Sequence, residues 1–204
     1  MSLRFASLAA VALSALSLSS AHAQSAPSTD PAAVPAGTYA VEPAHTRVLF
    51  AVSHMGFTTY YGDFTKVSGN LSIDPSKLDA AALSISIPVA TVSTTNPKLD
   101  EELKSAQWLD AGAYPAMTFT ATKITPTGAG LADVTGDLTL HGVTRPVTLA
   151  VKFNAVGVNP LDHKTTIGFE GSAHVHRSDF GVKTYVPLIG DDVTVIISAA
   201  FEKQ

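Results

Sequence analysis

Two histidines that share one face of a predicted strand are the residues best suited to chemistry in this sequence. In His174-Val175-His176 the imidazoles stand at positions i and i+2, which project from the same side of a β-strand. Two such side chains could bind one metal ion, so a metal-dependent hydrolase or isomerase is one candidate function. The pair also lies opposite the apolar side chains of its strand, which favours a solvent-facing pair as the alternative interpretation.

No further catalytic motif supports the metal interpretation. Gly168 and the two histidines resemble the first half of the cupin metal motif, but the expected acidic ligand falls on Phe180 or Gly181, Asp179 comes one position early, and no second motif follows. A Gly-x-Ser-x-Gly elbow, a His-Glu-x-x-His motif, a phosphate-binding loop and a dinucleotide fingerprint are also missing. The chain has no cysteine, which excludes thiolate metal sites and cysteine nucleophiles. We therefore predict a protein that is not an enzyme and has no cofactor.

His54 is a different kind of candidate. It continues the apolar face of Val48, Phe50 and Val52, so it could be the polar group at the mouth of an apolar cavity. A core histidine that bonds to a backbone carbonyl is the more ordinary alternative.

The elements that position these residues have a hydrophobic period of two. Apolar side chains alternate with polar ones in eight runs, a pattern typical of strands with one buried face. The runs are Val48–His54, Val67–Ile73, Leu83–Val89, Met117–Ala121, Val134–Leu140, Val147–Phe153, Ile167–Val175 and Val193–Phe201. Turn residues such as His141-Gly142 separate most of them. The pattern predicts an all-β protein, either a closed antiparallel barrel or a sandwich.

One segment departs from this period. Asn96-Pro97 can cap and begin a short helix that contains Leu99 and Leu103, and Tyr114-Pro115 ends any helix that remains. The helix either closes an opening of the barrel or packs on its outside as a crossover.

Several inward positions carry small residues. If they leave space, a barrel of eight strands can hold one small ligand, and an apolar void would bind an apolar guest. The same glycines could instead mark bulges or sharp bends. The small residues are Gly69, Ala121, Gly136, Gly171, Ala173 and Ala199.

The N-terminal residues indicate export. Arg4, an apolar stretch and Ala21-His22-Ala23 together predict a signal peptide over residues 1–23 that is cleaved after Ala23. Residues 24–36 are rich in proline and are predicted to form a flexible linker. The folded domain then covers residues 37–204. The net charge of −4 over 204 residues excludes a general attraction to nucleic acid, and no segment is predicted to span a membrane.

Four ordered motifs resemble the YceI-like polyisoprenoid-binding family. The first is His45–Phe57 (HTRVLFAVSHMGF) with Gly62-Asp63-Phe64, and the second is Leu103–Pro115 with its Trp108 and Tyr114-Pro115. The third is Gly136–Pro146 (GDLTLHGVTRP), and the fourth is Gly168–Gly181, which ends in Arg-Ser-Asp-Phe-Gly. The resemblance covers nearly the whole chain after residue 36.

The resemblance implies an eight-stranded antiparallel, lipocalin-like barrel with one short helix. It also implies a periplasmic protein, often a homodimer, whose cavity holds a long isoprenoid or a similar amphiphilic lipid. Where the family often has Arg-Asp-x-His-Leu on its helix, this chain has Leu99–Leu103 (LDEEL). The lost cation and imidazole favour a neutral, quinone-like or amide-like end of the lipid over an anionic head group.

These observations predict a periplasmic lipid carrier or scavenger. A structural or stress-response module with a filled barrel is the remaining alternative. The residues predicted to contact the lipid are Phe50, Val52, His54, Phe64, Phe119, Leu138, Leu140, Leu149 and Phe169.

Overall fold

The computed structural model describes residues 26–204, so the predicted signal peptide lies outside the described residues. Within residues 26–204, no helix has the length and apolar character needed to cross a bilayer.

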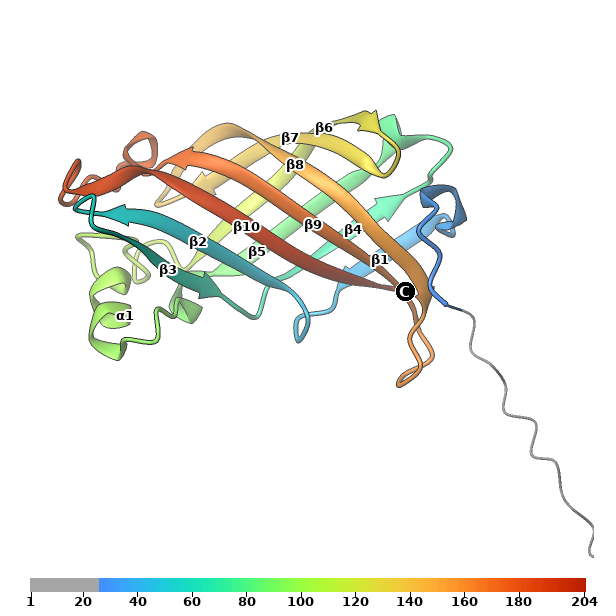
Figure 1. The fold of residues 1–204 in the computed structure, drawn as a ribbon, viewed down its shortest axis with the longest axis horizontal. Coiled ribbons are helices and arrows are strands. Elements are labelled where there is room, and N and C mark those ends of the chain that lie inside the picture. The colour runs from blue at the N-terminus through green and yellow to red at the C-terminus, as the bar shows by residue number, and fades with distance from the viewer. Residues whose placement is uncertain (1–25) are drawn as a thin grey trace, which may run out of the picture.

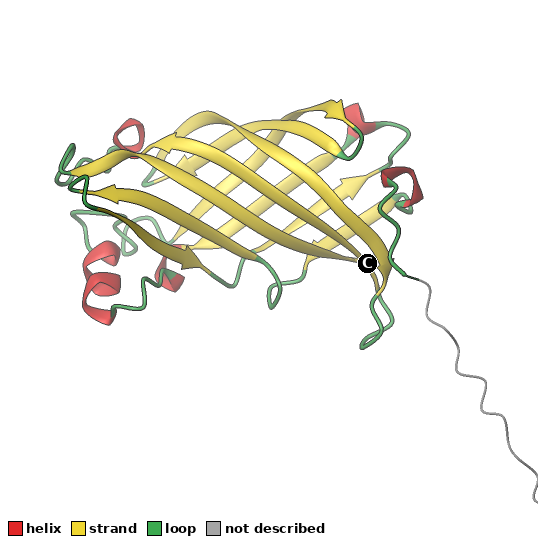
Figure 2. Ribbon diagram, viewed as in Figure 1, coloured by secondary structure: helices red, strands yellow, loops and turns green. Residues whose placement is uncertain are grey.

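An antiparallel sheet closes on itself to form the barrel (Figures 1 and 2). Its strands are β1 Gly37–Val41, β2 Arg47–His54, β3 Thr58–Phe64, β4 Ser68–Ile73, β5 Ala82–Pro88, β6 Ala116–Gly128, β7 Leu131–Leu140, β8 Val143–Val158, β9 Thr165–His176 and β10 Ile189–Lys203. Strands β4 to β10 pair in sequence order, and β10 then pairs with β1, which pairs with β4. This ring confirms the predicted eight-stranded barrel and excludes the sandwich.

Two neighbouring positions in the barrel wall are each shared by two strand segments. One edge of β10 pairs with β2 along its first part and with β1 near its end, so β1 and β2 together occupy one position in the wall. β3 and β4 divide the next position in the same way, since β3 pairs with β2 and β4 pairs with β1. Ten strand segments therefore build eight barrel positions.

This division leaves a seam in the wall. β3 pairs with β2 but not with β5, and its further backbone contact is a pair of 2.9 Å hydrogen bonds between Asp63 and Ser93. The segment 89–111 covers this seam. It contains the 3₁₀ turn η3 Val89–Thr91 and the helix α1 Pro97–Lys104, and its side chains Val89 and Val92 are buried.

Helix α1 begins where the sequence predicts. The Asn96 side chain accepts hydrogen bonds from the N–H groups of Lys98 and Leu99, Pro97 is the first helical residue, and the helix ends at Lys104. Because Leu103 and the following Leu109 pack against the core and line the cavity, the segment closes the barrel rather than packing on its outer surface.

The two ends of the barrel are built differently. The helix end carries α1, the β2–β3 turn and η4 Arg177–Phe180 with the loop that follows it (Figure 1). The opposite end, here called the strap end, carries η2 Leu78–Ala80, the β8–β9 turn and an N-terminal strap. Figure 2 shows the short helices gathered at these two ends, outside the strand wall.

The N-terminal strap, residues 26–36, corrects the predicted flexible linker. It contains the turn η1 Pro31–Ala33, capped by the Asp30 side chain, and Ser28 exchanges backbone hydrogen bonds of 2.8 and 2.9 Å with Val156. Val34 is only 5% exposed. The segment has one sizeable apolar side chain, and its burial in the barrel acts together with the Val156 hydrogen bonds and the Asp30 cap to hold the strap.

Candidate functional site

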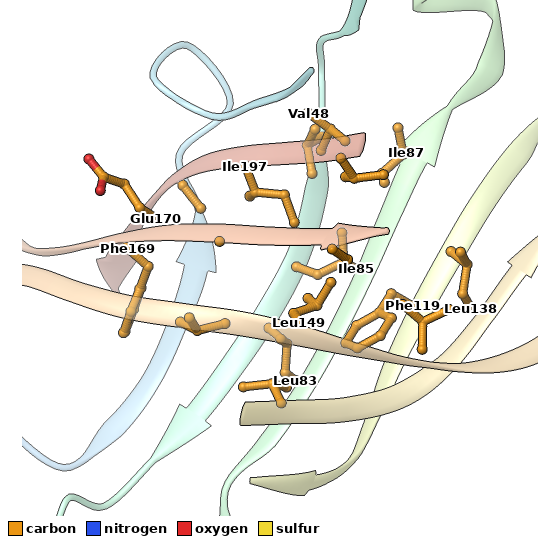
Figure 3. Close-up of a pocket in the computed structure, with 18 of the residues that line it drawn as sticks. Val48, Leu83, Ile85, Ile87, Phe119, Leu138, Leu149, Phe169, Glu170 and Ile197 are labelled. Carbon is orange, nitrogen blue, oxygen red and sulfur yellow. The ribbon is translucent and has the colours of Figure 1, made fainter. Parts of the chain in front are cut away.

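An elongated cavity runs through the barrel. Its volume is about 560 Å³, and it is lined from the strap to α1 by side chains of nearly every strand. Figure 3 shows side chains from opposite walls, among them Ile85, Leu149 and Ile197, directed into one common space, whereas Glu170 points away from it. This void contradicts the alternative of a filled barrel.

Eight of the nine predicted contact residues line this cavity. They are Phe50, Val52, Phe64, Phe119, Leu138, Leu140, Leu149 and Phe169. Seven of them stand in runs of alternating residues, where the inward face of a strand can be identified by counting, whereas Phe64 lies on β3 outside those runs. That they bind a ligand remains a prediction.

His54 does not line the cavity, which differs from its predicted place at the polar end. It is the last residue of β2, and its ring lies 6.0 Å from the ring of Tyr60. The strand extends past the cavity at the helix end, so this last position falls at the margin of the barrel.

Some of the small inward residues leave space in the cavity, whereas others are required by close packing of the chain. Gly171, Ala173 and Ala199 line the cavity and leave it space. Gly136 instead accommodates the Phe119 ring, whose nearest atom would lie 2.4 Å from an added Cβ. At Gly69, with φ of +146°, an added Cβ would lie 2.1 Å from the Ser84 carbonyl oxygen, so this glycine is required by the close approach of two strands.

Arg177 closes the helix end of the cavity. Its guanidinium donates hydrogen bonds of 2.8 to 3.0 Å to the carbonyl oxygens of Val182, Thr184, Ile189 and Gly190. In the sequence, a position at the end of a strand run does not distinguish Arg177 from a solvated charge. The role of Arg177 depends on hydrogen bonds to backbone carbonyl oxygens, and a pattern of side-chain types does not reveal such bonds.

Trp108 completes this closure. The Arg177 guanidinium carbon lies 5.4 Å from the centre of the Trp108 ring, a cation–π contact, and the indole N–H donates to Glu102 at 3.2 Å. Burial lowers the pKa of the Arg177 guanidinium, while the charge of Asp191 opposes this shift.

The polar groups around the cavity are therefore already engaged. Thr46, which also lines it, bonds through its hydroxyl to the backbone of Ala200. Over residues 26–204, no buried side-chain nitrogen or oxygen atom lacks a hydrogen-bond partner. Because a buried charge needs a partner, this arrangement suits an uncharged apolar guest.

At the strap end, the covering residues are Pro31, Ala32 and Val34. Leu131, the first residue of β7, also lines the cavity and is 46% exposed. The strap thus covers the cavity where its lining meets solvent.

The two histidines lie on the outside of the barrel. Both are exposed, and Nδ1 of His174 is 3.1 Å from a carboxylate oxygen of Asp192. Among the described residues, no three His, Cys, Asp or Glu side chains are grouped as a metal site would require. The geometry matches the solvent-facing interpretation and gives the metal interpretation no support.

Comparison with known sequences now adds to this geometry. The sequence profile of the YceI-like domain matches residues 39–201. This range contains strands β2 to β9 and most of β1 and β10. The chain belongs to the YceI-like domain family. A relative, the UPF0312 protein of Ectopseudomonas mendocina, is 34% identical over 165 residues, which span 80% of this chain and 86% of the relative.

Two solved structures have a similar fold. BcnA of Burkholderia cenocepacia superposes with a TM-score of 0.71 at 27% identity, over 78% of this chain and 98% of BcnA. A polyisoprenoid binding domain from Saccharophagus degradans superposes with a TM-score of 0.64 over 83% of this chain and 100% of that domain. At 15% identity, the second likeness shows the fold alone.

Proposed function

We propose that this YceI-like protein is a periplasmic carrier or scavenger that holds one long, uncharged lipid chain in its barrel. An isoprenoid or a quinone-like lipid fits best. The observation that carries the proposal is the cavity of about 560 Å³ whose lining is apolar and whose few polar groups are already bonded within the protein.

The cavity volume indicates the size of the guest. A methylene group and a water molecule occupy similar volumes, about 30 Å³ each, so the cavity has room for about 20 such groups. At about 0.8 kcal/mol for each buried methylene, a guest of this size would gain on the order of 15 kcal/mol before the costs of association are subtracted. Such a site selects by length and width, with little discrimination between lipids of similar shape.

Other observations support the chemical class and the location. The Saccharophagus degradans domain with this fold is described as polyisoprenoid binding. The predicted signal peptide, with its Ala21-His22-Ala23 site, supports export to the periplasm.

Binding without catalysis is also part of the proposal. The side chains that face the cavity are mostly hydrocarbon, and Arg177 and Thr46 are hydrogen-bonded to backbone groups. A general acid or base needs a titratable group within hydrogen-bond reach of the substrate.

The test is to identify the lipid in protein purified from the periplasm without detergent. Solvent extraction followed by mass spectrometry should recover an isoprenoid or quinone-like lipid at close to one molecule per chain. A Leu140→Glu variant should fold and be exported but retain little lipid, because its carboxylate would face the apolar cavity. A native protein that yields no stoichiometric lipid, and binds none when isoprenols are added, would overturn the proposal.

A further inference from the structure

Two neighbouring loops at the helix end expose large apolar side chains. The β2–β3 turn contributes Met55 and Phe57, and the loop before β10 contributes Tyr185, Val186 and Leu188. We call these five residues the apolar rim. The Met55 N–H donates to the Leu188 carbonyl oxygen at 2.8 Å, so the two loops lie side by side. Phe57 is 86% exposed and Leu188 is 61% exposed.

The apolar rim lies directly outside the closed end of the cavity. The rings of Tyr185 and Trp108 meet edge to face, with their centres 6.1 Å apart, and Trp108 lines the cavity from inside. Leu188 is exposed, whereas its neighbour Ile189 lines the cavity. The loop 183–188 is therefore a thin partition with apolar side chains on both of its sides.

Arg177 fixes this partition in place. Its guanidinium bonds to the carbonyl oxygens of Thr184 at one end of the loop and Ile189 at the other. Within the loop, the Ile189 N–H donates to the Tyr185 carbonyl oxygen at 2.8 Å. Because the backbone is held, the rim is ordered before it meets a partner, which lowers the entropic cost of docking.

The charge around the rim favours a phospholipid surface. Residues 53–61 and 181–190 contain no Asp or Glu, and Lys183 is their one Lys or Arg, although the whole chain has a net charge of −4. The nearby acidic side chains of α1 are engaged: Asp100 bonds to Thr94, Glu101 to Lys104 and Glu102 to Trp108. Asp110, Asp179, Asp191 and Asp192 also lie at the helix end, but outside the two rim loops, so the lack of acidic charge is a property of the rim loops themselves.

The same features disfavour a second copy of this chain as the partner. A twofold interface brings a surface patch against the same patch of the second copy, where Lys183 would find no acidic partner because the rim loops contain no Asp or Glu. At a bilayer, Lys183 would instead meet lipid phosphates, and tyrosine would lie at the head-group level it prefers.

We propose that the apolar rim is a membrane-docking surface that inserts into the head-group region of a phospholipid bilayer, placing the helix end of the cavity against the source of its lipid. This inference rests on the proposed function and adds the partner and the end of the barrel that faces it. In the docked protein, the loop 183–188 would be the partition between the bilayer and the helix end of the cavity.

Vesicle flotation tests the docking surface. The exported chain is mixed with vesicles of phosphatidylethanolamine and phosphatidylglycerol, and the fraction that floats with them is measured. The test variant combines Phe57→Ser with Leu188→Ser. The matched control is Leu161→Ser, which removes an apolar side chain that is 89% exposed but lies on the β8–β9 turn at the strap end.

The native protein and the Leu161→Ser control should float equally. The double variant should partition at least tenfold more weakly, because it loses two large apolar side chains, with an unchanged thermal midpoint. Equal flotation of the double variant, or no flotation of the native protein, would overturn docking through the rim. Loss of a dimer in gel filtration without a change in flotation would also overturn it, since the rim would then be a self-association surface.

Lipid extraction from the same preparations separates this inference from the proposed function. If the native protein contains lipid but does not float, the docking surface is refuted while the cavity function stands. If it floats but neither contains nor binds lipid, the proposed function fails and the docking result remains.

Discussion

Filling the cavity from one wall should change which lipids fit. Gly171 lines the cavity on β9, and an added Cβ would lie 3.5 Å from Cβ of Ile197 and 3.8 Å from a methyl group of Val151. These are ordinary contact distances, and the backbone there needs no glycine-specific conformation. Gly171→Leu can therefore be accommodated, with its side chain directed into the void.

The magnitude follows from the volume. Four side-chain carbons at about 30 Å³ each occupy about 120 Å³, roughly a fifth of the cavity's 560 Å³. A guest that filled the native cavity would lose about four methylene-sized groups, or about 3 kcal/mol at 0.8 kcal/mol each. This corresponds to about a hundredfold weaker binding, whereas a guest short enough to fit the remaining space should be little affected.

The assay is competition by geraniol, farnesol and geranylgeraniol against a fluorescent lipid. The Gly171→Leu variant should bind geranylgeraniol much more weakly than the native protein but bind geraniol almost equally. Gly171→Ala, which adds one carbon, is the matched control and should behave like the native protein. If Gly171→Leu is folded and binds all three alcohols as the native protein does, the lipid does not occupy this cavity and the reasoning is wrong.

Three other substitutions test the two ends of the barrel. Arg177→Met leaves the carbonyl oxygens of Val182, Thr184, Ile189 and Gly190 without their donor and should lower the free energy of unfolding by about 3 kcal/mol or more in urea denaturation, whereas an unchanged midpoint would contradict the clamp. Val34→Asp places a carboxylate where the strap enters the core and should speed lipid release and protease cleavage of residues 26–36 while the barrel stays folded, which stopped-flow fluorescence and mass spectrometry can measure. The Asp191 carboxylate accepts hydrogen bonds from the Ser178 hydroxyl and N–H, which lower its pKa, so its stabilising effect is present above its ordinary pKa of about 4 and is lost as the pH falls through the lower, folded-state value. The thermal midpoints of native protein and Asp191→Asn should thus differ at neutral pH and converge in acid, and a constant difference would refute this assignment.

The long strands and most of the cavity wall could be predicted because alternation is a local property. Strands β8 and β9 present one face to the cavity over residues 147–153 and 169–175, so counting by two identifies inward residues like Leu149 and Phe169. The helix start was equally readable, since an Asn-Pro cap is local chemistry.

The remaining elements depend on partners that are distant in sequence. β1 and β3 are short and follow no clear alternation, and they are strands because β10, β4 and β2 offer paired edges. The strap depends on a pocket for Val34 at the barrel end, and the role of Arg177 depends on four carbonyl groups brought together by a loop. Composition and spacing contain no information about these surfaces.

The seam between β3 and β5 gives the barrel one wall that differs mechanically from the others. Elsewhere, separating two neighbours would break a row of ladder hydrogen bonds, but here the closure depends largely on side chains of residues 89–111. Widening at this line would expose some apolar surface without unzipping any long strand pair. We expect the barrel to widen more readily at this side than elsewhere in its circumference.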